Sequence, residues 1–449
     1  MSATPPARAM SARSPSLWRH PEFVKLWAAS AVSDVGSQVS ALVLPLVAAL
    51  TLEATAWQMG LLSAAESAPT LLVGLLAGVW VDRLRRRPVM IAADLGRAAL
   101  LLAIPIASAA GGLRIELLYA VSLLAGALTV LFDVAHLSYL PSLVAREQLV
   151  DGNSKLETTA SVAQVVGPGV GGVLVKLLGA PFAVLVDALS FVVSALFLTR
   201  IPADEPAPAA PDERPGLAAE IGEGLRVVLT NPILRVLMGC SATTNLFGRM
   251  FLSVYVLYMT RDLGLGSVGV GAVFATGGLG SLAGALIAAP ATRRFGPGPT
   301  MIAAQLAFGV TGLAVPLAVL VPEAALPMVV AAEFGQWASF IVYYVNVVSV
   351  RQAITPDRLR GRVNATVRFM VGGALPIGAL LGGALGGRIG LPLTLVAAEF
   401  GLLVSVLWLW FSPVRGLRAL PAEPTGSSSS GSASRLETCS SGPRPEGQD

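Results

Sequence analysis

Charged residues are scarce in this sequence. They make up 13% of its 449 residues, whereas soluble globular proteins have about a quarter. Hydrophobic residues make up 54% of the chain, and its mean hydropathy is +0.71. Because a soluble fold rarely tolerates this balance, we expect most of the chain to lie within a lipid bilayer.

Cysteine and histidine are almost absent, which excludes several kinds of site. Cys240 falls in an apolar stretch and Cys439 in a polar tail, so a disulfide framework is not supported. The two histidines, His20 and His136, are too few for a zinc site built on an H-E-x-x-H motif. We therefore expect no metal site and no bound cofactor.

Lysine is also rare, and its contexts argue against nucleotide-driven chemistry. Lys25, Lys155 and Lys176 follow Val, Ser and Val, so the chain has no G-x-x-x-x-G-K-[ST] loop for ATP phosphates. Residues 167–172 fit G-x-G-x-x-G formally, but they lie within an apolar stretch and follow no strand. We expect that the chain binds no dinucleotide and is not an enzyme.

Apolar stretches of about 20 residues recur along the chain, and each is long enough to cross a hydrocarbon layer of roughly 30 Å as a helix. The first follows a polar, Arg-bearing lead and is too long for a cleaved signal, so we expect it to remain as an anchor. The predicted fold is an all-α membrane protein with twelve transmembrane helices, over residues 23–50, 57–81, 88–110, 115–138, 154–175, 181–199, 233–259, 267–290, 299–320, 325–349, 363–386 and 391–411.

The basic residues are distributed very unevenly about these spans. Of the 31 Lys and Arg residues, 26 fall on one side, Arg249 falls within a span, and Arg114, Lys176, Arg261 and Arg388 fall on the other side. By the positive-inside rule, the richer side and both termini are cytoplasmic. The net charge of +4 thus reflects membrane topology, and we expect no nucleic-acid partner.

A Pro-rich, charged segment divides the chain into two halves of six spans. Residues 201–215 contain five prolines and are too polar to bury. Apolar residues then recur at helical spacing among charges, which predicts a short helix on the cytoplasmic surface. We expect an N-terminal tail (1–22), an N-terminal six-helix bundle (23–200), a cytoplasmic linker (201–232), a C-terminal six-helix bundle (233–412) and a disordered cytoplasmic tail (413–449).

The two halves carry a faint internal repeat. Asn153 precedes Gly171-Gly172 by 18 residues in the fifth span, and Asn364 precedes Gly382-Gly383 by the same separation in the eleventh. Internal repeats of this kind are typical of transporters built from two pseudo-symmetric bundles.

The loop after the second span carries a charged motif. It reads Gly78-Val-Trp-Val-Asp82-Arg83-Leu-Arg85-Arg86-Arg87, which resembles the signature loop G-x-x-x-D-R-x-G-R-R of the major facilitator superfamily, with Arg85 in place of the central Gly. The resemblance implies a cytoplasmic gate, in which Asp82 meets the start of the eleventh helix near Arg362. A basic loop that only fixes topology is the alternative, although it leaves Asp82 unexplained.

The fifth span contains Gly167-Pro168-x-x-Gly171-Gly172, which is similar to the G-P-x-x-G-G core of a motif found in exporters of this superfamily. Pro168 interrupts the helical hydrogen bonds, and the glycines allow a neighbouring helix to approach closely. The alternative is close packing without any implication for the direction of transport.

Three further stretches resemble the subgroup that contains the enterobactin exporter and macrolide efflux proteins. They are residues 131–144, 187–191 and 351–368, and the resemblance extends over residues 21–412. It implies the major facilitator fold and a secondary transporter, one that exports small amphipathic molecules such as drugs, macrolides or siderophores.

Ionisable residues within spans are costly, so they are candidates for a cavity or for an ion pair. The resemblance implies a cavity lined by the first, fourth, seventh and tenth helices. It therefore favours Asp34 and Glu333, then Asp133, with Glu66 and Arg249 as further proton-coupling or cavity candidates. We expect Asp94 and Arg97 to pair with the basic loop. The remaining acids within spans are Asp187 and Glu399.

The combined expectation is a monomeric transporter of the inner membrane, driven by the proton gradient, whose partners are a small-molecule substrate, protons and lipid. Two alternatives remain open. One is uptake of a nutrient or siderophore on the same fold. The other is a membrane sensor or partner subunit that does not transport.

Overall fold

The computed structural model describes residues 17–74, 80–81, 84–202 and 217–419, and every regular element in them is a helix. The first half of the chain forms α1 (Pro21–Leu46), which continues as η2 (Val47–Thr51), α2 (Ala56–Leu72), α4 (Arg86–Ala109), α5 (Ile115–Leu143), α6 (Leu149–Leu178), α7 (Ala180–Ala183) and α8 (Leu185–Thr199). The second half forms α9 (Leu217–Thr230), α10 (Pro232–Arg261), α11 (Ser267–Phe295), α12 (Pro297–Gly312), α13 (Ala314–Leu317), α14 (Ala325–Ile354), α15 (Asp357–Ile389) and α16 (Leu391–Trp410). Short 3-10 turns, η1 (Leu17–Arg19), η3 (Arg146–Gln148), η4 (Ala318–Leu320), η5 (Pro322–Ala324) and η6 (Pro413–Gly416), flank them.

The predicted class, an all-α membrane protein, is confirmed. Ten of the described helices are long and apolar enough to cross a membrane, and α9 with α10 forms a pair bent by 107°. The described part of α2 has 17 residues, and residues 75–79 beyond it lie outside the described part. The count of twelve spans therefore stays a prediction.

Several helices are longer than the spans expected from hydropathy. α6, α14 and α15 have 30, 30 and 33 residues. The excess lies mainly at the polar ends, since hydropathy marks only the apolar part, whereas the helices continue through Asp, Arg and Gln.

Helix boundaries follow from local sequence. The Asn231 side chain accepts hydrogen bonds from the Ile233 and Leu234 amides, and Pro232 occupies the first turn, so α10 begins here and α9 bends away. Gly179 and Gly390 adopt φ of 83° and 85°, which suits glycine, and each joins two helices without a longer loop. Gly179 follows the Gly171-Gly172 pair by the same number of residues as Gly390 follows Gly382-Gly383.

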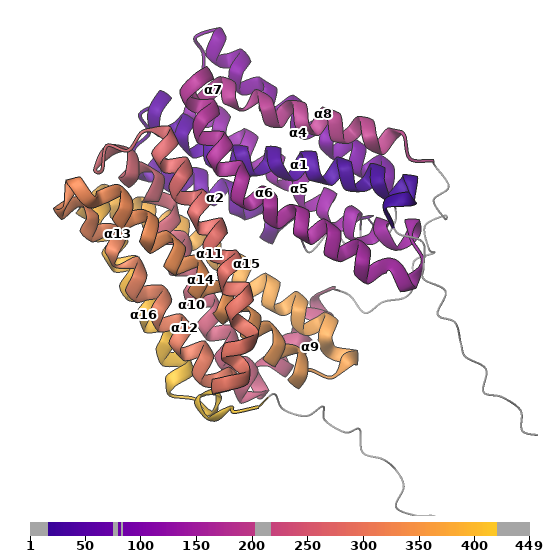
Figure 1. Cartoon of the computed structure of the whole chain (residues 1–449), viewed down its shortest axis with the longest axis vertical. Coiled ribbons are helices and arrows are strands. Elements are labelled where there is room, and N and C mark those ends of the chain that lie inside the picture. The colour runs from indigo at the N-terminus through magenta and orange to yellow at the C-terminus, as the bar shows by residue number, and fades with distance from the viewer. Residues whose placement is uncertain (1–16, 75–79, 82–83, 203–216, 420–449) are drawn as a thin grey trace, which may run out of the picture.

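The helices form two bundles, as expected (Figure 1). α1, α2, α4, α5, α6 and α8 form one, and α10, α11, α12, α14, α15 and α16 form the other. The ends of the described chain and α9 mark one face of the molecule, which we call the terminal face. There Lys25 Nζ donates to the Arg200 carbonyl, at 2.8 Å, and the Gly298 amide donates to the Leu417 carbonyl, at 3.1 Å.

The bundles contact each other backbone to backbone toward the opposite face, through α2 with α15 and α6 with α11. A Cβ on Gly60 would lie 2.7 Å from Gly383 Cα, and one on Gly172 would lie 2.5 Å from the Ser267 carbonyl oxygen. Only glycine permits such close approach. This packing leaves the larger cavities at mid-depth and toward the terminal face.

The expected pairing of Asp94 and Arg97 with the basic loop is wrong. Both residues are buried in the N-terminal bundle, at 0% and 2% exposure, and form an ion pair with each other. Ser194 Oγ donates to Asp94 at 2.7 Å, and the guanidinium lies over the rings of Phe132 and Phe191. Burial makes a partner inside the bundle necessary, since an isolated buried charge is very costly.

The helix α9 packs on the C-terminal bundle at the terminal face. Val228 is buried against Leu234 and Val363, and Glu223 forms an ion pair with Arg362 at the start of α15. The position of α9 is thus fixed by contacts with the C-terminal bundle, in addition to the membrane surface that its amphipathic sequence favours.

Candidate functional site

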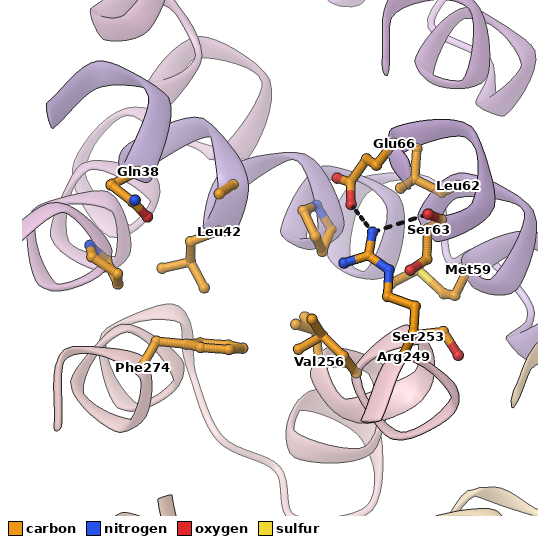
Figure 2. A pocket seen from close by; sticks show the side chains of 14 residues that line it. Gln38, Leu42, Met59, Leu62, Ser63, Glu66, Arg249, Ser253, Val256 and Phe274 are labelled. Carbon is orange, nitrogen blue, oxygen red and sulfur yellow. Dashed lines mark hydrogen bonds and ion pairs between the residues drawn. The ribbon is translucent and has the colours of Figure 1, made fainter. Parts of the chain in front are cut away.

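A cavity of about 190 Å³ lies between the two bundles (Figure 2). Its walls come from α1, α2 and α6 on one side and from α10 and α11 on the other. Most of the lining is apolar. The polar groups within it are Gln38, Ser63, Glu66, Arg249 and Ser253.

An ion pair joins the bundles across this cavity. Arg249 Nη2 of α10 lies 2.9 Å from Glu66 Oε2 of α2, and it also donates to the Ser63 carbonyl at 2.9 Å. The side chains are 17% and 28% exposed, so the pair faces the cavity while remaining largely shielded. Ser63 and Glu66 stand three residues apart on α2, which brings both acceptors to one side of the helix.

A second cavity, of about 200 Å³, lies within the C-terminal bundle among α10, α12, α14, α15 and α16. Glu333 lies at its wall and is 3% exposed. Its two carboxylate oxygens accept hydrogen bonds from Tyr255 Oη, at 3.0 Å, and from Trp337 Nε1, at 2.8 Å. The aromatic residues of the lining are Phe251, Tyr255, Phe308, Trp337 and Phe340.

A third cavity, of about 540 Å³, lies within the N-terminal bundle between α1, α5 and α6, in the half nearer the terminal face. Asp34, Asp133 and Glu157 line it, and the described lining residues include no Lys or Arg. His136 Nε2 lies 2.9 Å from Ser30 Oγ. This cavity is thus lined by three acidic residues, whereas each of the other two cavities is lined by one, Glu66 or Glu333.

Comparison with known proteins identifies the family. A family profile described as "Transmembrane secretion effector" matches residues 11–435, nearly the whole chain. The chain belongs to this family. It is a transporter of the major facilitator superfamily, and its relatives are transporters rather than enzymes.

Named relatives of this transporter are exporters. It is 29% identical over 360 residues to "Multidrug efflux pump Tap" of Mycolicibacterium fortuitum, which covers 78% of this chain and 86% of the relative. It is 28% identical over 418 residues to "Enterobactin exporter EntS" of Escherichia coli O1:K1 / APEC, which covers 91% and 96%. The predicted family and subgroup are thereby confirmed.

The solved structure of a bacterial homologue of the iron transporter ferroportin has the same fold. Its inward-facing state aligns with a TM-score of 0.74, at 17% identity, over 88% of this chain and 99% of the other. Its outward-facing state aligns with a TM-score of 0.56, at 18% identity, over 87% and 98%.

The exporter-like motif of this transporter lies where α6 meets two neighbours. A Cβ on Gly167 would lie 2.4 Å from Gln38 Cβ of α1, and Gly172 meets Ser267 of α11 as described above. Gly171 also faces α1, with Val39 O 3.4 Å from an added Cβ, while Pro168 lines the cavity between the bundles. The motif therefore combines close packing with a place in the cavity wall.

The gate motif is described only in part. Gly78, Asp82 and Arg83 lie outside the described residues, so the expected contact of Asp82 with α15 stays a prediction. Arg86 begins α4. Arg87 donates to the Leu198 and Thr199 carbonyls at the end of α8, at 2.9 and 2.6 Å, and so ties α4 to α8.

The sequence-predicted acids do not share one site. Asp34 and Asp133 line the N-terminal cavity, whereas Glu333 lines the C-terminal one. Glu66 and Arg249, ranked lower, are the two that meet. The signal for this pair was the arginine itself, because a cation within a span requires an acidic partner.

Proposed function

We propose that this transporter exports small amphipathic organic molecules across the inner membrane by proton-coupled alternating access. The observation that carries the proposal is the Glu66–Arg249 ion pair, which joins the two bundles within a cavity between them. The substrate class rests on the relatives named as drug and enterobactin exporters and on the mainly apolar cavity walls.

The terminal face is assigned to the cytoplasm because most basic residues of the chain fall on that side. The bundles pack closely toward the opposite face, and the largest of the three cavities described above lies nearer the terminal face. The higher TM-score with the inward-facing state supports the same assignment. The structure then represents the state that takes up substrate from the cytoplasm.

Coupling follows from what a proton does to the ion pair. Protonation of Glu66 removes its charge, so the attraction to Arg249 across the bundles is lost. The bundles can then separate or rearrange, and deprotonation restores the pair. Asp34, Asp133 and Glu333 are further proton-carrying candidates in the two other cavities.

Vesicle transport tests the proposal. The experiment uses inside-out vesicles from cells without their own pumps. The vesicle interior is acidic, and the substrate is added outside. We expect the vesicles to accumulate compounds from a panel of amphipathic drugs, macrolides and siderophores. A pH-sensitive dye should report proton loss during accumulation. Glu66→Gln should bind substrate but lose gradient-dependent accumulation, since its neutral amide resembles a permanently protonated acid.

Other outcomes would support the alternatives. Accumulation only in right-side-out vesicles would indicate uptake, and binding without transport in either orientation would indicate a sensor. If accumulation by Glu66→Gln depends on the proton gradient as in wild type, another acid must couple transport to the proton.

A further inference from the structure

Glu399 of α16 is a buried acid that the proposed coupling does not use. It is 0% exposed, and one of its oxygens, Oε2, has no hydrogen-bond partner among the described residues. The other, Oε1, accepts a hydrogen bond of 2.8 Å from Gln336 Nε2. Gln336 belongs to α14 and lines the C-terminal cavity. Glu399 thus acts on the cavity through a neighbour.

The Gly312 position makes room for this contact. A Cβ at residue 312 would lie 2.1 Å from Gln336 Nε2 and 2.2 Å from Glu399 Oε1. Any side chain on α12 here would separate the two groups. The absence of a side chain therefore lets the Glu399–Gln336 hydrogen bond form.

This hydrogen bond fixes which end of the amide faces the cavity. Because the N–H end of Gln336 is directed to Glu399, the carbonyl oxygen is left for the cavity. Gln336 follows Glu333 by three residues on α14, so this second acceptor lies on the same side of the helix as the Glu333 carboxylate.

The hydrogen-bond donors in the cavity wall are largely occupied by protein acceptors. Tyr255 and Trp337 donate to Glu333, and Asn245 Nδ2 donates to the Ser241 carbonyl at 2.8 Å. Arg249, which lines this cavity and the interface cavity, is paired through Nη2 with Glu66, while its buried Nε has no hydrogen-bond partner among the described residues. Acceptors and aromatic faces remain for a ligand.

We propose that Glu399 is a positioning residue, which holds Gln336 so that the C-terminal cavity selects a protonated amine on an aromatic or apolar body and disfavours an anion. The Gln336 carbonyl and the Glu333 carboxylate receive the N–H groups, and the aromatic lining attracts the cation through its ring faces. This inference rests on the proposed function, because it names the substrate class of that transporter.

Direct binding to the full-length protein in detergent tests the inference without any gradient. Two xanthene dyes serve as probes, rhodamine 123 as the cation and fluorescein as the anion, with fluorescence anisotropy as the measurement. Wild type should bind rhodamine 123 more tightly. Glu399→Leu and Gly312→Ala should each weaken rhodamine 123 binding about tenfold, as expected for a misdirected hydrogen bond, and narrow the preference over fluorescein.

Two further variants separate positioning from folding. Glu399→Gln should stay within about twofold of wild type, because its amide oxygen can still accept from Gln336. Gln305→Leu removes another buried amide of the same bundle, one that donates to Thr244 and Ser405, and should keep the preference for the cation. If Glu399→Leu does not fold, Gly312→Ala and Gln336→Leu carry the test.

Unchanged rhodamine 123 affinity in folded Glu399→Leu, or equal binding of the two dyes by wild type, would overturn the inference. Binding that depends on Glu399 without export from vesicles would instead contradict the proposed function alone. Export of amphipathic compounds by a transporter whose rhodamine 123 binding does not depend on Glu399 would contradict the inference alone.

Discussion

Asp94 and Arg97 show how this transporter accommodates charge within its N-terminal bundle. Each is almost completely buried, and the guanidinium lies 4.5 and 4.0 Å from the ring centroids of Phe132 and Phe191. Phe132 also lines the N-terminal cavity and stacks on His136. A buried pair thereby supports the wall of a cavity that it does not itself line.

Removal of one member of this pair should destabilise the protein. Arg97→Met leaves Asp94 buried without a cation, and we expect a loss of about 3 to 5 kcal/mol in the free energy of unfolding. Thermal unfolding in detergent measures it. The double variant Asp94→Leu/Arg97→Met should recover part of the loss, whereas Arg388→Met, at an exposed arginine, should change little. Equal stability of Arg97→Met and wild type would mean that the pair contributes nothing.

Individual residues were predictable from the sequence only as candidates. The acids and the arginine within apolar stretches were visible because charge is rare there. Their pairing was not, because Glu66 and Arg249 are separated by more than 180 residues and meet only through packing of α2 against α10. Helices buried on several sides show no single apolar face, so the sequence does not indicate which side of α2 carries Glu66 toward its partner.

Helices α2 and α15 form a contact that depends on glycine. A Cβ on Gly383 would lie 2.9 Å from both Gly60 Cα and the Ala56 carbonyl oxygen, whereas one on Gly387, a turn further along α15, would meet nothing within 4 Å. The two glycines therefore form a matched pair for substitution.

Gly383→Ala should push α2 and α15 apart and disfavour the observed packing by about 1 to 3 kcal/mol, the usual cost of overpacking. The fraction of molecules opened at this face should rise accordingly. Spin labels at Thr55 and Arg388, at the ends of the two helices, measure it through their distance distribution. Gly387→Ala is the control and should match wild type. Identical distributions for both variants would contradict a role of the glycine contact in state preference.

At this level the sequence predicted more. Apolar length located the helices, because hydropathy is a local signal. The glycines that separate neighbouring helices, Gly179, Gly296 and Gly390, each precede a proline by one or two residues, a local signal that the prediction did not use. The polar extensions of α6, α14 and α15 were not predicted, since hydropathy is silent once a helix leaves the apolar layer.

Among the described residues, most Lys and Arg lie at the helix ends of the terminal face, and this gives a prediction for the topology of the whole molecule. Reporter fusions after Arg87, Arg214 and Arg418 should report the cytoplasm, and fusions after Leu113 and Leu391 should report the outside, because basic loops are retained in the cytoplasm. An external Arg214 would contradict both the boundary between the halves and the even number of spans.

The connections at the face opposite the chain ends are very short. They comprise residues 52–55, 110–114, 179, 262–266, 321 and 390, so each has between one and five residues. Segments of this length offer no exposed loop for a protease to bind in extended form or for an antibody to recognise. If that face points outward, proteases and antibodies added to intact cells should hardly cleave or bind the transporter. Labelling of the transporter from outside will then require an inserted epitope. The five-residue connections at 110–114 and 262–266 are better sites for it than the single-glycine junctions, where an insertion would separate two helices that are now held together by one residue.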